Sequence, residues 1–182
     1  FAAYYIRLYA LVTEGGIYLD SDVEVLKTFD DLLHLPFFIC KENSPQGVEA
    51  ATIGAEAGTS WLIKCLEYYN EKTFVDSSGK EQTAVLPSIL QDCISRNFDI
   101  CYIDSPLEFN VNKNTVFVLP MDYFSPKNYV TKKIVITENT YSIHHFAGTW
   151  QPGWKKTLLY LWVPFSIKFP RLAAWLKQKI SN

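Results

Sequence analysis

Two carboxylates follow a short apolar run, and their type and spacing suit a divalent cation. Asp20 and Asp22 come directly after Ile17 to Leu19, which we expect to form a buried strand. In open α/β sheets, ligands collect at the carboxyl ends of strands, where both acids fall. Mg²⁺ and Mn²⁺ prefer carboxylate and phosphate oxygens, so two acids suffice if a diphosphate supplies further ligands. The sequence therefore predicts a metal site at Asp20 and Asp22.

A calcium-binding loop is another use of closely spaced acids. An EF-hand loop beginning at Asp20 would need glycine at position 25 and a bidentate acid at position 31, between two helices. Val25 stands where the glycine is required, and the pattern on both sides is strand-like. We therefore set the EF-hand interpretation aside.

The segment before the predicted strand is expected to be a helix with a single positive charge. Phe1 to Glu14 carries apolar residues at helical spacing, and the pair Gly15 and Gly16 ends it. Arg7 lies four positions before Leu11, near one edge of the apolar face. Two interpretations stay open: a solvated surface arginine, or one that leans toward the acids and helps to position an anionic or hydroxyl-rich ligand.

The string from Arg7 to Asp22 resembles the pattern R-x-x-x-L-x-x-x-G-G-x-Y-x-D-x-D of the DXD-containing sugar transferases. These include the family 32 capsular-polysaccharide and yeast mannosyltransferase-like enzymes and, more distantly, the glucosylating clostridial toxins. The resemblance implies a GT-A type α/β fold, with a mixed sheet flanked by helices, a nucleotide-diphosphate sugar donor and Mn²⁺ or Mg²⁺. It is strong from Phe1 to about Phe29, fair from His144 to Trp154 and weak between them.

The same resemblance implies roles for the three charged residues. Asp22 would ligate the ion, Asp20 would contact the ion or the sugar hydroxyls of the donor, and Arg7 would orient the donor. The family usually carries Ser-Asp in an S-D-x-x-R arrangement, where the aspartate helps to bind the sugar. Here Ala3 and Tyr4 occupy those positions, so part of the sugar-binding half of the motif is changed.

A second stretch, near position 145, resembles the late motif of GT-A enzymes. Imidazole nitrogen binds Mn²⁺, and on this match His145 is the third metal ligand. Trp150 and Lys155 then fall where related enzymes hold the diphosphate, with Lys156 as the alternative to Lys155. A histidine pair taken alone would instead indicate hydrogen-bonded structure.

The rest of the chain predicts scaffold. We expect helices over Trp61 to Lys72 and Pro87 to Asn97. Glu42 and Glu49 are interpreted as loop acids. Short strands are expected at residues 35–40, 51–55, 100–103, 116–119 and 133–136.

Size and composition favour one catalytic domain followed by a short tail. The 182 residues are 48% hydrophobic, enough for a core, and we place a partial catalytic domain at 1–154 and a tail at 155–182. The first nucleotide-binding strand of the family would lie upstream of Phe1. The four cysteines show no zinc-ligand spacing, so we expect buried free thiols and a cytoplasmic setting.

The tail combines basic and aromatic residues and contains no acid. Trp and Phe favour the headgroup layer of a bilayer, and each basic residue gains about 1 kcal/mol near anionic lipid. We therefore expect either a peripheral contact with the inner membrane face or an ordinary terminal helix packed on the core. No apolar run is long enough to span a membrane.

Together these features predict a metal-dependent glycosyltransferase, a hexosyltransferase acting in cell-surface polysaccharide synthesis such as that of a capsule. Its acceptor would be a glycan or a lipid-linked glycan, no nucleic-acid partner is expected, and the family implies retention at the anomeric carbon. Two other classes stay open. One is a non-catalytic sugar- or nucleotide-binding domain, motivated by Ala3 and Tyr4, and the other is a metal-dependent phosphoester hydrolase, which normally needs more ligands.

Overall fold

The structure of the protein is a computed structural model. This structure describes residues 2–43, 47–70, 72–73, 75, 79, 84–110, 114–129 and 131–148, and further along the chain residues 162, 165, 166, 168–172, 175 and 176. The chain divides into two compact units, Phe1–His145 and Phe146–Asn182. The predicted boundary after Trp154 therefore falls inside the second unit.

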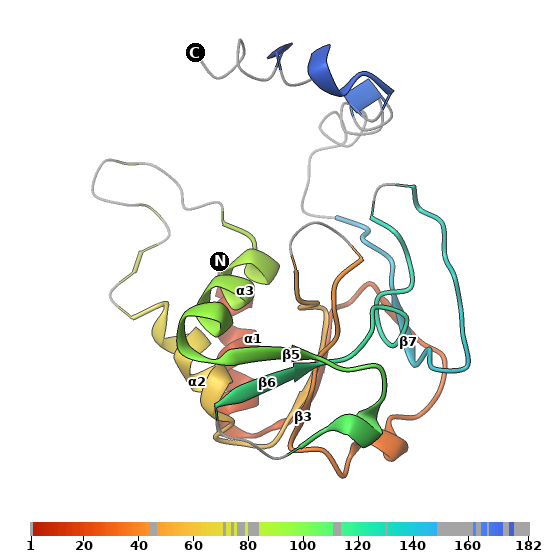
Figure 1. Cartoon of the computed structure of the whole chain (residues 1–182). Coiled ribbons are helices and arrows are strands. Elements are labelled where there is room, and N and C mark those ends of the chain that lie inside the picture. The colour runs from red at the N-terminus through yellow and green to blue at the C-terminus, as the bar shows by residue number, and fades with distance from the viewer. Residues whose placement is uncertain are drawn as a thin grey trace. The chain divides into compact units, whose positions relative to one another are not determined.

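Three helices gather at one side of the first unit (Figure 1). They are α1 (Ala2–Thr13), α2 (Ser60–Glu67) and α3 (Leu86–Asn97). In α1, Leu8 and Leu11 are almost fully enclosed, whereas Ile6 and Tyr9, also apolar, are exposed. Because Arg7 lies one helical turn before Leu11 on the same side of α1, the packing of the helix carries this arginine into the interior as well.

Gly15 determines how α1 connects to the first strand. Its backbone is left-handed, with φ of +70°, which ends the helix and turns the chain back. A Cβ at this position would lie 2.7 Å from the amide nitrogen of Ala57 and 2.9 Å from the carbonyl oxygen of Ala55. Only glycine allows this close approach, so the glycine pair both ends α1 and lets the next strand dock.

The strands form three small sheets rather than one continuous sheet. β1 (Gly16–Leu19), β4 (Thr52–Ala55) and β3 (Phe37–Phe38) make an antiparallel sheet in the order β1-β4-β3. β2 (Val23–Val25) pairs antiparallel with β7 (Ser142–His144), and β5 (Asp99–Tyr102) pairs parallel with β6 (Thr115–Val118). Within the described residues of the first unit there are also two short 3-10 turns, η1 (Asp30–Leu32) and η2 (Pro106–Glu108). This mixed α/β arrangement of small sheets flanked by helices confirms the predicted fold class and is consistent with a GT-A type fold.

Three predicted elements differ from the structure. Residues 133–136 make only the isolated bridge from Ile134 to Lys127, and Val135 and Ile136 are exposed, so this apolar run has no sheet to join. The strand expected at 35–40 is reduced to β3 and a bridge at Cys40. Helix α2 ends at Glu67, because the chain then turns through Tyr69 instead of continuing to Lys72.

Pairing between distant segments determines where the strand ends meet. The amide of Asp20 donates to the carbonyl of Ala51 at 2.8 Å, which ties the end of β1 to the start of β4. Val23 lies opposite His144 in the β2-β7 pair. Two segments more than a hundred positions apart in the sequence thus meet beside the acidic turn that joins β1 to β2.

The cysteines are free thiols, as predicted. Cys40, Cys65 and Cys93 are buried, and Cys101 is half-buried. Burial raises the pKa of the Cys40 thiol well above its ordinary value, because the charged thiolate would be poorly solvated there. These cysteines behave as small apolar residues of the core.

In the second unit, the described part of the tail contains helical turns with exposed apolar side chains. Phe169, Leu172 and Trp175 are exposed, and the charged residues Lys168 and Arg171 lie among them in the sequence. Within the described residues, no helix is both long and apolar enough to span a bilayer. Peripheral membrane contact stays a prediction, and flotation with anionic and neutral liposomes tests it.

Candidate metal and nucleotide-sugar site

Asp20 is held in place by two side chains at the end of β1. Its Oδ1 lies 2.5 Å from a guanidinium nitrogen of Arg7 and accepts a hydrogen bond of 2.7 Å from the Tyr18 hydroxyl. Both hydrogen bonds that the described side chains make to this carboxylate end on Oδ1. Since Asp20 is 27% exposed, its Oδ2 is the oxygen that is left for a cation or a ligand hydroxyl.

Arg7 is buried, which decides between the two interpretations of the sequence. It is 5% exposed and donates to the carbonyl oxygen of Ala50 as well as to Asp20. Its guanidinium carbon also lies 4.3 Å from the centre of the Tyr18 ring, a cation–π contact. Arg7 therefore leans toward the acids, as one interpretation predicted. It acts by fixing Asp20 and the chain before β4, and its burial leaves little surface for a donor sugar.

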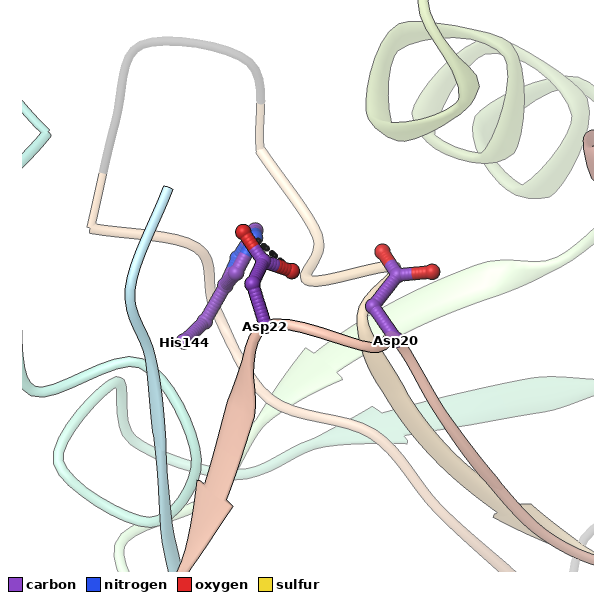
Figure 2. Close-up of side chains that lie close together, drawn as sticks. All are labelled: Asp20, Asp22 and His144. Atoms are coloured by element: carbon purple, nitrogen blue, oxygen red, sulfur yellow. Dashed lines mark ion pairs between the residues drawn. The ribbon is translucent and has the colours of Figure 1, made fainter. Parts of the chain in front are cut away.

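Asp22 meets a histidine across the β2-β7 pair. The Nε2 atom of His144 lies 3.7 Å from Oδ1 of Asp22. Figure 2 shows Asp20, Asp22 and His144 projecting to the same side from neighbouring chain segments, with Asp22 and His144 adjacent. One donor atom from each of the three residues falls within 4.8 Å of the others. Two carboxylates and an imidazole suit Mn²⁺ in particular, so the donor set fits the predicted ion.

The structure places the predicted ligand His145 elsewhere and brings its neighbour His144 to the acids instead. The Nε2 atom of His145 is 2.8 Å from the exposed carboxylate of Glu24. His144 is the last residue of β7, and its ring approaches Asp22, which lies in the turn just before β2 and outside the paired residues. The side chain of His145 pairs with Glu24 instead, although its backbone amide donates to the carbonyl of Asp22.

A buried glutamate stands behind His144. Glu49 has no exposed surface and approaches Nδ1 of His144 at 3.2 Å. Burial alone raises the pKa of Glu49, but the hydrogen bond and charge of His144 and the amide of Ala51 outweigh it, so this pKa lies below the ordinary value. Burial lowers the pKa of His144. The nearby carboxylates of Glu49, Asp22 and Asp20 raise it by more than burial lowers it, so the pKa lies above its ordinary value. A cation at this site would compete with that proton.

The remaining predicted residues are only partly placed. Tyr4 is half-buried on α1, with its ring centre 5.8 Å from the guanidinium carbon of Arg7, and its part in sugar binding stays a prediction. Trp150 and Lys155 lie outside the described residues. Glu42 and Glu49, interpreted from the sequence as loop acids, are both buried, because the segment that carries them packs beneath the site.

The segment that carries Asp20 and Asp22 is similar to a known protein family. Residues 2–38 match the family described as a glycosyltransferase sugar-binding region containing the DXD motif. This stretch of the chain is therefore similar to a DXD glycosyltransferase region, in agreement with the motif. The match contains α1, β1, the two acids and β2, and it ends with the last residue of β3.

Two curated proteins share similarity with this chain. Inositol phosphoceramide mannosyltransferase 3 of Schizosaccharomyces pombe is 37% identical over 59 residues, which cover 32% of this chain and 16% of the relative. Glucan organizing enzyme 1 of Cryptococcus neoformans var. grubii serotype A is 48% identical over 46 residues, covering 25% of this chain and 13% of the relative. The matches thus span less than a fifth of either relative. No solved structure matches the chain.

Three residues near the two acids are not predicted as site residues from the sequence: Tyr18, Glu49 and His144. Tyr18 was part of the matched string, but nothing in the string showed that its hydroxyl binds Asp20. Glu49 carries no signal except its position two residues before a predicted strand, where an acid is usually solvated. Nothing in the sequence favours His144 over His145, because the choice depends on the path of the turn that brings Asp22 beside the end of β7.

Substitution of the two adjacent histidines tests this assignment. We expect His144→Ala to weaken Mn²⁺ binding at least about tenfold, because losing even a residue behind a metal ligand costs about 10–100-fold in affinity. His145→Ala removes only an exposed pair with Glu24, worth about 0–1 kcal/mol, and is the matched control. Isothermal titration with Mn²⁺ measures both. A larger loss in His145→Ala would restore the assignment made from the sequence.

Proposed function

We propose that this protein is a metal-dependent glycosyltransferase that moves a sugar from a nucleotide-diphosphate donor to a glycan or lipid-linked acceptor. The observation that carries the proposal is the convergence of His144 on Asp20 and Asp22, the two acids of the stretch that matches a DXD glycosyltransferase region. Both relatives carry names from carbohydrate chemistry, a mannosyltransferase and a glucan organizing enzyme. A role in cell-surface polysaccharide synthesis, a hexosyl donor and retention at the anomeric carbon belong to the same proposal.

Some residues of the site would bind the cation, and others hold those ligands in place. Asp22 and His144 offer an oxygen and a nitrogen to the same point, and Asp20 offers its Oδ2 to that point or to a sugar hydroxyl. Arg7 and Tyr18 keep Asp20 in a fixed orientation, which spares the site an ordering cost when the donor binds. A bound Mn²⁺ or Mg²⁺ would neutralise charge on the departing nucleoside diphosphate. The described residues offer no carboxylate that we assign as a nucleophile.

A screen of nucleotide sugars against the full-length protein with Mn²⁺, read by mass spectrometry, tests the proposal. We expect transfer from one donor to an acceptor, and loss of transfer when the metal is chelated. Release of free sugar without dependence on acceptor would instead indicate a hydrolase. Binding of nucleotide sugar without either product would indicate the non-catalytic binding domain, which Tyr4 favours because a neutral ring replaces the carboxylate of the family motif.

Tyr4 provides a separate test of the donor pocket. Restoring the motif with Tyr4→Asp would place a carboxylate near Arg7, where it could accept hydrogen bonds from sugar hydroxyls. We expect nucleotide-sugar binding to strengthen by about 1.5–3 kcal/mol, the value of a charged hydrogen bond, while nucleotide binding changes little. The neighbouring Tyr5→Asp is the control, because Tyr5 is exposed and stacks with Tyr9. Equal effects on both ligands would place Tyr4 outside the sugar pocket.

A further inference from the structure

Glu49 is a fully buried carboxylate that hydrogen-bonds to Ser125 and also to three groups of the candidate site. Its Oε1 accepts from the amides of Ala50 at 2.9 Å and Ala51 at 2.7 Å. Its Oε2 lies 3.3 Å from Nδ1 of His144. A buried charge is costly unless it is paired and hydrogen-bonded, so an apolar interior does not explain an acid at this position.

The segment that Glu49 holds also anchors the acidic side of the site. Ala50 gives its carbonyl to Arg7, and Ala51 gives its carbonyl to the amide of Asp20. The backbone amides of the same two residues donate to Glu49. One buried side chain therefore links the histidine on β7 to the strand end that carries Asp20.

The two ring nitrogens of His144 face different groups. Nδ1 points to Glu49, and Nε2 points to the side of Asp22. An ionised carboxylate can only accept a hydrogen bond, so the neutral imidazole carries its proton on Nδ1. The lone pair then lies on Nε2, which is the nitrogen that faces the two aspartates.

We propose that Glu49 is a positioning residue that fixes the Nδ1–H tautomer and the ring orientation of His144, so that Nε2 can bind a divalent cation together with Asp20 and Asp22. Carboxylate partners of metal-binding histidines act in this way in many metalloproteins. The inference rests on the proposed metal-dependent function. The tautomer, however, is a property of the metal-free protein and can be measured without any ion.

Direct ligation by Glu49 is the competing arrangement. Glu42, Glu49 and His144 also bring one donor atom each within 4.8 Å of one another. Oε1 of Glu49 already accepts two amide hydrogen bonds, and the side chain has no exposed surface, which favours a supporting role over a ligand. The experiment below separates the two arrangements.

Glu49→Gln is the decisive substitution because it keeps the size and reverses one hydrogen bond. The two backbone amides need an acceptor, so they retain the carbonyl oxygen of the new side chain. Its NH₂ group then faces Nδ1 of His144 and can only donate, which moves the imidazole proton to Nε2. We expect Mn²⁺ affinity to fall about 10–100-fold, as for other residues that support a metal-binding histidine.

Nitrogen-15 NMR of the metal-free protein, above the pKa of His144, measures the tautomer, and calorimetry with Mn²⁺ measures the affinity. The expected result is Nδ1–H in the wild type and Nε2–H in Glu49→Gln, with weaker Mn²⁺ binding in the variant. Glu24→Gln is the matched control, since it makes the same change beside His145 and should leave both readouts of His144 unaltered.

The outcomes are distinguishable, including the case of a variant that does not fold. Nε2–H in the wild type overturns the inference without any variant. Glu49→Gln that keeps Nδ1–H but loses Mn²⁺ binding overturns it in favour of direct ligation by Glu49. A wild type that shows Nδ1–H and binds no Mn²⁺, alone or with nucleoside diphosphate, overturns the proposed metal-dependent function, and with it the inference.

Discussion

Asp22→Asn is expected to abolish glycosyl transfer by the full-length protein while leaving its fold intact. Asp22 ends the acidic turn beside His144, and the amide that replaces it is a poor ligand for a hard cation. Metal stabilisation of a leaving diphosphate is worth several kcal/mol, and each 1.36 kcal/mol is a factor of ten in rate. We therefore expect turnover to fall by about three orders of magnitude, measured with the donor that the nucleotide-sugar screen identifies.

Two controls separate this loss from a structural effect. Glu24→Gln changes an acid two positions away that pairs with His145 and not with the metal group, and it should keep near wild-type turnover. Circular dichroism and urea unfolding of Asp22→Asn should match the wild type. An active Asp22→Asn variant would mean that the aspartate is not the metal ligand.

Arg7→Met should have the largest effect on stability. It removes a buried cation, leaves Asp20 with the Tyr18 hydroxyl but without its ionic partner, and takes from the carbonyl of Ala50 the guanidinium that donates to it. Breaking a buried ion pair by removing one partner costs about 3–5 kcal/mol. We expect about 3 kcal/mol of lost unfolding free energy, the low end, because water reaches the 27% of Asp20 that is exposed. Urea unfolding of the purified chain measures it.

Arg96→Met is the matched control for Arg7→Met. Arg96 is 73% exposed on α3 and pairs with Asp92 one helical turn away, so its loss should cost less than about 0.5 kcal/mol. The double variant Arg7→Met with Asp20→Asn should recover part of the stability, since it removes the unpaired charge. If Arg7→Met were no more destabilising than Arg96→Met, the account of Arg7 as the residue that holds Asp20 would fail.

Local patterns predicted the frame of the site well. The glycine pair, the apolar run before Asp20 and the spacing of Leu8 and Leu11 each depend on neighbours within a few positions, and α1 and β1 appear where those patterns place them. The run at 133–136 had an equally convincing strand pattern. It makes only one isolated bridge, because a strand needs a partner and no local pattern supplies one.

The parts of the site that the sequence did not predict depend on contacts between distant segments. His144 approaches Asp22 where β7 pairs with β2, and Glu49 meets His144 across 95 positions of sequence. Neither these contacts nor burial can be read from the residues alone, so the motif match favours His145, and Glu49 has the pattern of a loop acid. The acidic pair of the candidate site is predictable as Asp20 and Asp22, but the proximity of His144 and the contact with Glu49 are not.

Pulsed electron paramagnetic resonance of Mn²⁺ bound to the protein with UDP or GDP tests the central claim most directly. The account predicts that one ion couples both to nitrogen-14 of an imidazole and to phosphorus-31 of the diphosphate. The nitrogen coupling should disappear in His144→Ala and persist in His145→Ala. Phosphorus coupling without any nitrogen coupling in the wild type, or nitrogen coupling that survives His144→Ala, would contradict the site composed of Asp20, Asp22 and His144.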